Sequence, residues 1–378
     1  MKQIPPVDLT RQYQLIKAEA DSAVLDILSS GRYIGGEAIA TLEREFANYI
    51  GVSECVSCNS GTDALFLALR ALDIGAGDEV ITTPFSFFAT AEVITRVGAK
   101  PVFVDLDLDT FNFDLAQIEQ AITPNTKAIM PVHLFGQPVD MTKLMAIAKQ
   151  HQLYVIEDCA QAAGAEWSNE KIGSIGDVGC FSFFPTKNLG ACGDGGSITT
   201  NNPAIAKQMR ILKEHGSPAR YRHDFVGINS RIDAVQAVIL SIKLPYLDYW
   251  NQQRAKAAQY YQQLLQYVDA IGLPQALSGG TSVWNQYTVC VKQQSVSNQK
   301  GRELLQQKLR DRGVISMIYY PIPLHLQPVY EDLGYKKGQL PKVEQAAQEV
   351  LSLPMFPGIS AQEQEQVVDA LKDCLLEI

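Results

Sequence analysis

Long apolar runs and an excess of basic residues are both missing from this sequence. No stretch approaches the ~18 apolar residues that a membrane-spanning helix needs, and the opening MKQIPPVDLT has no charged segment followed by an apolar one, as a secretory signal would. The 41 acidic residues outnumber the 32 basic ones, which gives a net charge of −9. Because that charge repels polyanions, we expect a cytoplasmic protein whose main partner is neither nucleic acid nor a membrane.

Metal-binding patterns are also lacking. The seven cysteines are an odd number without a secretory signal, so reduced thiols are expected rather than a disulfide framework. Cys55 and Cys58 form a CxxC pair, which could be redox-active or half of a zinc site, but no second pair or clustered histidine completes a ligand set. The pair lies in a strand-like stretch, where residues three apart point to opposite faces, so we expect two buried thiols and no metal. Four histidines show no ligand spacing either: His133, His151, His215 and His223.

What the sequence does contain is the alternation typical of an α/β fold. Its 378 residues suffice for about two to three domains. The first two-thirds alternate short β-branched runs with stretches of helical spacing, which predicts a mainly parallel central sheet flanked by helices. Strands are expected at 78–82, 101–105, 128–132 and 153–157, and helices at 62–72 and 140–150.

The last third of the chain has a different pattern of expected helices and strands. Leu244-Pro245 interrupts a long helical stretch. Beyond it lie amphipathic helices, a short strand around residues 287–291 and the Pro-rich run YYPIPLHLQP. We therefore expect a large domain over residues 1–245 and a smaller α+β domain over residues 246–378.

Three segments of the expected large domain carry candidate chemistry. In NSGTDAL, Gly61 and Thr62 open a helix whose free N–H groups would attract phosphate, although the segment alone is more typical of a plain capped helix start. Asp158 follows the apolar strand YVI, where open α/β sheets place ligands, but it could also cap the next helix. Lys187 follows an apolar strand in FSFFPTKNLG. Burial there would lower its pKa and make it nucleophilic, although a solvated surface lysine is the commoner case.

Together these segments fit the cofactor pyridoxal 5'-phosphate. A phosphate cup would anchor its tail, and a carboxylate at a strand end would keep the pyridine nitrogen protonated. A lysine 29 residues later (187 minus 158) would supply the amine for the Schiff base. An aromatic ring stacked on the cofactor would complete the set, and PFSFFAT offers candidates.

The order of motifs resembles one family over nearly the whole chain. SGTDAL, PFSFFAT, EDCAQAAGA, FSFFPTKNLGACGDGG, HGSPARYRHDFVGINSRID and YYPIPLHLQPVY look like segments of the DegT/DnrJ/EryC1/StrS family. Its members are fold-type-I, pyridoxal-phosphate-dependent aminotransferases that act on nucleotide-linked keto sugars. The resemblance implies that fold and a homodimer with composite active sites. Cys159 and Ala163 stand where the family more often has Ala and His or Leu, so details of the pocket can differ.

The resemblance also implies roles for individual residues. Lys187 would be the Schiff-base lysine and the proton shuttle, and Asp158 would pair with the pyridinium nitrogen. Gln161 would contact the ring hydroxyl of the cofactor, and Phe87 would stack on its ring. The phosphate would be bound by Gly61, Thr62 and Ser182, and Asn229 would reach the phosphate bound in the neighbouring subunit.

The implied reaction moves an amino group from L-glutamate, released as 2-oxoglutarate, to a nucleotide-diphosphate keto sugar. SFFPTK followed by GDGG resembles members that aminate a 3-keto sugar, of the dTDP-3-keto-6-deoxyhexose or UDP-3-keto uronic acid type, with a slight preference for the first. Substrate contacts are expected for Arg231, Tyr320 and His325. An ion pair of Arg231 with Asp233 or a neighbour, and plain loop packing of the other two, are open alternatives.

Three other functions stay open. The chain could be a 4-keto sugar aminotransferase, or a non-catalytic regulatory protein that binds pyridoxal phosphate. The sequence shows no helix-turn-helix extension or basic patch, and it retains the lysine, which disfavours the regulator. A nicotinamide-dependent oxidoreductase is disfavoured because GAG is followed by DEV and does not complete G-x-G-x-x-G after a strand.

Overall fold

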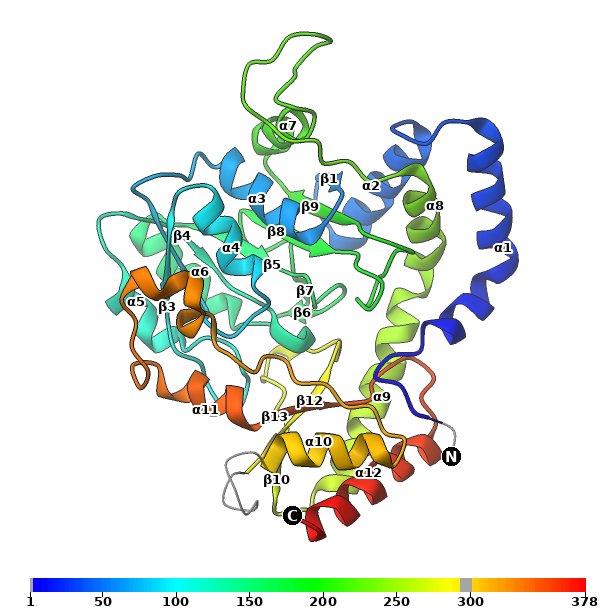
Figure 1. Cartoon of the computed structure of the whole chain (residues 1–378). Helices are drawn as coiled ribbons and strands as arrows, with labels where there is room; N and C mark the ends of the chain where they lie inside the picture. Colours follow the sequence, from blue (N-terminus) through cyan, green and yellow to red (C-terminus); the bar gives the residue numbers. More distant parts are fainter. Residues whose placement is uncertain (1–2, 293–300) are drawn as a thin grey trace.

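A seven-stranded sheet forms the centre of the molecule (Figure 1). The computed structural model describes residues 3–292 and 301–378. The strand order is β1-β9-β8-β5-β4-β2-β3, and β9 runs in the direction opposite to the other six. The bounds are β1 (Glu54–Cys58), β2 (Glu79–Thr82), β3 (Lys100–Phe103), β4 (Thr126–Met130), β5 (Tyr154–Asp158), β8 (Val178–Ser182) and β9 (Gly196–Thr200). The predicted mainly parallel sheet is therefore confirmed, and its four predicted strands match β2 to β5 within two residues.

Helices cover both faces of this sheet. Their bounds are α1 (Leu9–Ser30), α2 (Glu37–Ile50), α3 (Gly61–Ala71), α4 (Ala89–Arg96), α5 (Ile118–Ala121), α6 (Met141–His151), α7 (Pro203–Leu212) and α8 (Ala234–Lys243). The exception is α1, which packs against α8 (Figure 1). Apolar side chains of α2, α6 and α8 pack in one core, and those of α3, α4 and α7 pack in another. The two predicted helices correspond to α3 and α6, and Asp140 caps α6 by accepting a hydrogen bond from the N–H of Lys143.

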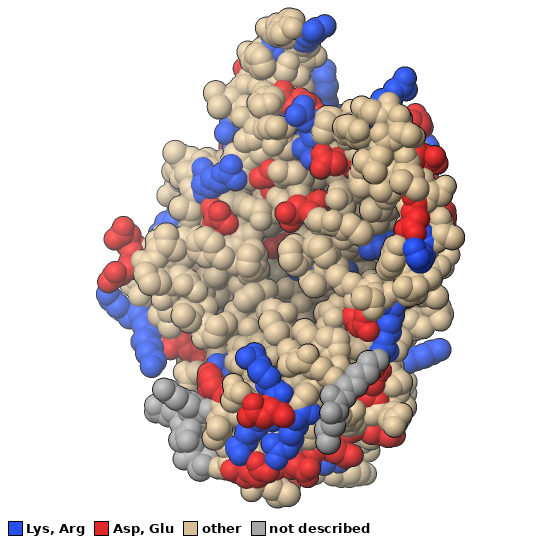
Figure 2. Space-filling view, turned by 45° about the vertical axis from the view of Figure 1, so that its right-hand side comes forward, with Lys and Arg blue, Asp and Glu red and all other residues tan. Residues whose placement is uncertain are grey.

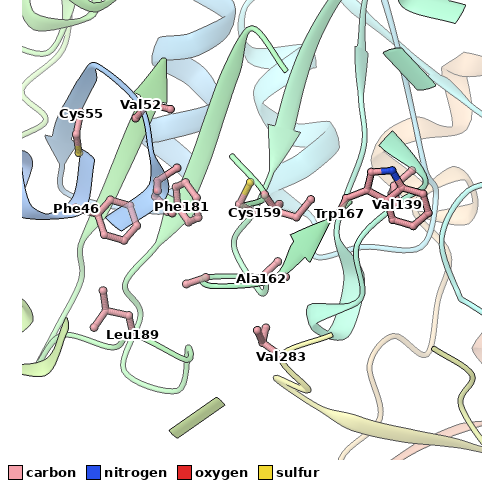
Figure 3. Packing of buried hydrophobic residues seen from close by; sticks show 14 of the residues in the cluster. Phe46, Val52, Cys55, Val139, Cys159, Ala162, Trp167, Phe181, Leu189 and Val283 are labelled. Atoms are coloured by element: carbon pink, nitrogen blue, oxygen red, sulfur yellow. The ribbon is translucent and has the colours of Figure 1, made fainter. Parts of the chain in front are cut away.

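Successive side chains of each strand point alternately into these two cores. In β1, Cys55 belongs to the core around α2, whereas Cys58 belongs to the core around α3. Both thiols are buried, as predicted, and they lie on opposite faces of the sheet. Figure 3 shows the first core, in which Phe46 of α2 meets Phe181 of β8 edge-on at 5.0 Å between ring centroids.

The rest of the chain builds a second, smaller sheet and its helices. A 3₁₀ turn (Leu244–Tyr246) with Pro245 at its start separates α8 from α9 (Leu247–Leu265), as predicted. The strands β10 (Ile271–Gly272), β12 (Tyr287–Val291) and β13 (Val350–Leu353) form an antiparallel sheet that packs against α9, α10 (Gly301–Asp311) and α12 (Ala361–Leu376). The predicted strand at 287–291 is confirmed as β12, and the division of domains at residue 245 stays a prediction.

Other segments join the two parts. α11 (Pro341–Glu349) packs its apolar face against side chains beyond β3 of the large sheet. A short sheet pairs β11 (Gly280–Thr281) with β6 (Glu166–Trp167), which pairs with β7 (Glu170–Lys171). Segments far apart in the sequence therefore meet near the carboxyl ends of β5 and β8.

The surface carries both signs of charge, and acidic and basic side chains are intermixed on the face shown in Figure 2. A long loop between α7 and α8 projects from the molecule at the top of Figure 1. Within residues 3–292 and 301–378, no helix combines the length and the hydropathy needed to cross a bilayer.

Candidate active site

A cavity of about 430 Å³ lies at the carboxyl ends of β5 and β8. Asp158 is the last residue of β5, and Ser182 is the last residue of β8. A volume of this size accommodates a ligand of cofactor dimensions. Seven of the eight residues predicted to bind the cofactor line it: Gly61, Thr62, Phe87, Asp158, Gln161, Ser182 and Lys187. The fold therefore gathers the three candidate segments in one place.

The start of α3 forms an anion-binding cup in this cavity. The first N–H groups of a helix have no acceptor inside it, and the positive end of the helix dipole lies there. Ser60 accepts a hydrogen bond from the N–H of Asp63, while Gly61 and Thr62 line the cavity. A Cβ at Gly61 would lie only 2.6 Å from Cβ of Ser182. Glycine is therefore required for α3 to approach β8 and to set the Ser182 hydroxyl beside the helix start.

Asp158 is a buried carboxylate with two donors. Its Oδ2 accepts a hydrogen bond from the Thr90 hydroxyl at 2.8 Å, and its Oδ1 accepts one from the N–H of Ala160 at 3.1 Å. The hydroxyls of Ser86 and Thr90 are in turn 2.7 Å apart. Burial raises the pKa of Asp158, whereas the hydrogen bonds of Thr90 and Ala160 and the charge of Lys187 oppose that rise. These contacts favour the ionised form that a protonated ring nitrogen needs.

Ser86 and Thr90 were missed by sequence reasoning. Both are buried and line the cavity. They belong to PFSFFAT, the segment that was singled out only for its aromatic rings. The serine and threonine in that segment could have indicated hydrogen-bond donors for Asp158.

Lys187 lies in the irregular loop after β8, where its backbone N–H donates to the backbone carbonyl of Phe184 at 2.9 Å. Burial lowers the pKa of Lys187 to about 8, and the negative charge of Asp158 opposes that shift. At neutral pH such an amine has a larger uncharged fraction than a solvated lysine, so it is the better nucleophile and base. Lys187 and Asp158 line the same cavity, and their roles toward a cofactor stay predictions.

Gln161, Tyr320 and Phe87 form another wall of the cavity. The amide oxygen of Gln161 accepts a hydrogen bond from the N–H of Phe135 at 2.7 Å, and its nitrogen donates to the hydroxyl of Tyr320 at 3.1 Å. Phe87 is 59% exposed, and its ring centroid is 6.5 Å from that of Tyr320. Phe87 therefore presents an uncovered aromatic face that a planar ligand could cover.

Three predicted residues lie away from this cavity in the protomer. Asn229 is exposed on the segment between α7 and α8. Arg231 makes an ion pair with Glu214 at 3.1 Å, which agrees with the alternative of a neighbouring acid rather than Asp233. His325 is buried, with Nε2 3.4 Å from the carboxylate of Glu344. Of the three predicted substrate contacts, only Tyr320 lines the cavity.

A group of potential metal ligands that the histidine spacing did not indicate includes the two residues on either side of Asp158 in the sequence. His133, Glu157 and Cys159 bring ligand atoms within 4.8 Å of one another. The carboxylate of Glu157 already accepts hydrogen bonds from three backbone N–H groups and contacts Nε2 of His133 at 3.1 Å. Nδ1 of His133 accepts from the N–H of Val139, which leaves the proton on Nε2. These polar atoms are engaged within the chain, and we assign no metal to them.

Comparison with known proteins identifies the family. The model of the DegT/DnrJ/EryC1/StrS aminotransferase family matches residues 14–372. The chain belongs to this family. It is 47% identical, over 98% of each chain, to a pleiotropic regulatory protein of Geobacillus stearothermophilus. It is 44% identical, again over 98% of each chain, to the UDP-N-acetyl-3-dehydro-alpha-D-glucosamine 3-aminotransferase of Acidithiobacillus ferrooxidans.

A solved structure has the same fold over its whole length. The crystal structure of S. venezuelae DesV in complex with a ketimine intermediate matches with a TM-score of 0.95, at 39% identity and with all of both chains covered. The expected fold type I is therefore confirmed. The chain is a sugar aminotransferase of this family, and its cofactor is pyridoxal phosphate.

The residues of the cavity fit this cofactor. N–H groups at the start of α3 and the Ser182 hydroxyl can take a phosphate. A buried carboxylate can face a protonated ring nitrogen, and a partly buried lysine with a lowered pKa can reach a carbonyl. Anion cup, carboxylate and amine all border the same cavity, as a single small heterocycle requires.

Proposed function

We propose that this chain transfers the amino group of L-glutamate to C3 of a nucleotide-linked keto sugar. The observation that carries the proposal is Lys187, whose pKa is lowered to about 8 in a cavity that also contains Asp158 and the helix start at Gly61. A nucleophilic amine, a buried carboxylate and an anion cup are the parts that amino transfer through pyridoxal phosphate needs.

Each wall of the cavity is proposed to contact a different part of the cofactor. The N–H groups of Gly61 and Thr62 and the Ser182 hydroxyl would hold its phosphate, and Nζ of Lys187 would hold its carbonyl carbon. Asp158 would accept a hydrogen bond from the ring nitrogen, Gln161 would contact the ring hydroxyl, and Phe87 would stack on the ring. When bound, pyridoxal phosphate supplies an electron sink for negative charge on the reacting carbon.

Lys187 is proposed to move the proton as well. Its neutral amine would accept the proton that leaves Cα of the amino donor, and the resulting ammonium would deliver that proton to the carbonyl carbon of the cofactor. A base works best when its pKa is near the working pH, because both protonation states are then populated. A pKa of about 8 meets this requirement, whereas the ordinary value of a solvated lysine does not.

The choice of C3 rests on two observations. SFFPTK with GDGG resembles members that act on 3-keto sugars, and the Acidithiobacillus ferrooxidans relative is named as a 3-aminotransferase. That relative uses a UDP sugar, whereas the sequence motifs slightly favour a dTDP-6-deoxyhexose, so both nucleotides enter the test. Tyr320 is the residue we propose to contact the sugar from within the same protomer.

A homodimer with composite sites is part of the proposal. The segment between α7 and α8 exposes Asn229 and large apolar side chains such as Tyr221 and Val226, which are 84% and 85% exposed. Exposed apolar groups of this size mark an interaction surface. We propose that Asn229 and Arg231 reach the site of a second copy, and that the enzyme works in the cytoplasm, where its thiols stay reduced.

Paired assays test the proposal. The purified protein is expected to show the visible absorbance of bound cofactor and to form 2-oxoglutarate from L-glutamate with 3-keto sugars carried on UDP or dTDP. Lys187→Ala should lose the absorbance and the transfer. Transfer by Lys187→Ala would contradict the proposal, and activity with 4-keto sugars alone would replace C3 by C4.

A further inference from the structure

The loop that carries Lys187 has neither helix nor strand to hold it in place. Residues 183–191 are turns and bends between β8 and the segment that leads to β9. Only a few backbone bonds cross it, such as the N–H of Ala191 to the carbonyl of Phe183 at 2.8 Å. A catalytic amine on such a loop needs other anchors, because small displacements of a reacting group slow catalysis strongly.

Three buried asparagines supply these anchors: Asn188, Asn251 and Asn285, which are 2%, 8% and 3% exposed. The amide nitrogen of Asn285 donates to the oxygen of Asn188 at 2.6 Å. The nitrogen of Asn188 donates to the oxygen of Asn251 at 2.6 Å, and the nitrogen of Asn251 donates to the carbonyl of Ala163 at 3.0 Å. We call this arrangement the asparagine chain.

Backbone carbonyls fix the direction of the asparagine chain. A carbonyl only accepts hydrogen bonds, so the amide nitrogen of Asn251 must face Ala163. The nitrogen of Asn188 also donates to the carbonyl of Val283 at 3.0 Å, and that of Asn285 contacts the carbonyl of Thr186 at 3.4 Å. Each amide therefore has one orientation that satisfies its neighbours.

The asparagine chain connects the Lys187 loop to three other parts of the molecule. Ala163 follows Gln161 on the loop after β5, Asn251 belongs to α9, and Asn285 precedes β12. Asn188 and Thr186 are the two residues that flank Lys187. The backbone on both sides of the lysine is therefore tied to the wall that carries Asp158 and Gln161 and to the segment that enters the smaller sheet.

We propose that Asn188, Asn251 and Asn285 act as positioning residues for Lys187. Their amides hold the loop so that Nζ meets the cofactor carbonyl and the proton it must move. Among the described residues, Oδ1 of Asn285 is the one side-chain amide atom of the three asparagines without a hydrogen-bond partner. The paired atoms of a buried polar network favour one geometry, and cutting it at any link leaves further buried polar groups unpaired. The inference rests on the proposed role of Lys187, but it concerns residues outside the cavity lining.

The experiment measures covalent capture of pyridoxal phosphate by the cofactor-free protein, followed as the growth of visible absorbance. Asn188→Leu has a similar shape and removes both links. We expect capture at least tenfold slower and a kcat at least tenfold lower, with the KM for the keto sugar within twofold of wild type. Gln364→Leu is the matched control, because Gln364 is also a buried amide, donates to the carbonyl of Ala257 at 2.7 Å and lies on α12. It should lower the thermal midpoint without changing capture.

The single variants Asn251→Ala and Asn285→Ala keep the test informative if Asn188→Leu does not fold. Each cuts the asparagine chain at one end. If the three amides act as one unit, the double variant captures cofactor no more slowly than the slower single variant. Effects that multiply, or capture and kcat within twofold of wild type in the folded variants, would overturn the proposal. The proposal would also be overturned if Gln364→Leu captured the cofactor more slowly in proportion to its lost stability, because slow capture would then follow from destabilisation alone.

The wild-type protein separates this inference from the proposed function. If wild type captures no pyridoxal phosphate, the role of Lys187 itself fails. If wild type captures it and the asparagine variants do so equally fast, only the positioning role fails.

Discussion

Thr90 donates the hydrogen of its hydroxyl to Oδ2 of Asp158 over 2.8 Å, and both side chains are buried. A hydrogen bond to a charged group contributes about 1.5–3 kcal/mol. Thr90→Val keeps the shape and removes the donor, so it should raise the pKa of Asp158 and disfavour the carboxylate that we propose to face the ring nitrogen. We expect pyridoxal phosphate to bind about ten- to a hundredfold more weakly, measured by spectral titration of the cofactor-free protein.

Thr90→Ser is the control for this prediction, since it retains the hydroxyl. Its cofactor affinity should stay close to that of wild type. Equal losses in the valine and serine variants would show that the methyl group of Thr90, and not its hydrogen bond, is what matters.

Gly61→Ala tests the anion cup. A Cβ there would sit 2.6 Å from Cβ of Ser182, so the start of α3 must move away from β8. The phosphate contacts should weaken most, and the preference for pyridoxal phosphate over pyridoxal should fall by about tenfold or more. Titration with both compounds measures it. Gly75→Ala, whose Cβ would be 3.4 Å from the carbonyl of Val97, should leave this preference unchanged.

The lowered pKa of Lys187 predicts a pH-dependent stability of the cofactor-free protein. The folded-state pKa is about 8 against an ordinary value of 10.5, so between these values the folded state binds fewer protons than the unfolded state. Burying Lys187 therefore lowers the free energy of unfolding below about pH 8, where the amine is charged in the unfolded state and costly to charge in the folded one. This penalty disappears above pH 10.5, where the amine is neutral in both states. Lys187→Met lacks it.

Urea unfolding at a series of pH values provides the measurement. Lys187→Met should be the more stable protein at pH 7, and wild type should close the gap by about 2–3 kcal/mol as the pH rises to 10.5. Parallel stability curves for the two proteins would mean that Lys187 is solvated in the folded state.

The parts of this protein that could be predicted from sequence depend on local patterns. The strands β2 to β5 follow from short β-branched runs, and α3 follows from its apolar stripe behind Ser60. Lys187 and Asp158 could be singled out as candidates because Asp158 ends one buried strand and Lys187 follows another, and parallel strands end at the same edge of a sheet.

The parts that could not be predicted depend on contacts between distant segments. Asn188 meets Asn251 and Asn285 across 63 and 97 residues, and no local pattern distinguishes these amides from surface asparagines. The ion pair of Arg231 with Glu214 and the burial of His325 against Glu344 likewise arise from loop packing. Tertiary packing decides such positions, because the same residue types are favourable in many surroundings.

The most direct test of the account identifies the amine that holds the cofactor. The purified protein is loaded with pyridoxal phosphate, reduced with borohydride so that the bond to that amine becomes permanent, and digested for peptide mass analysis. We expect the added mass on Lys187, and none in Lys187→Ala. A label on another lysine, or no label in a protein that still transfers nitrogen, would contradict this expectation.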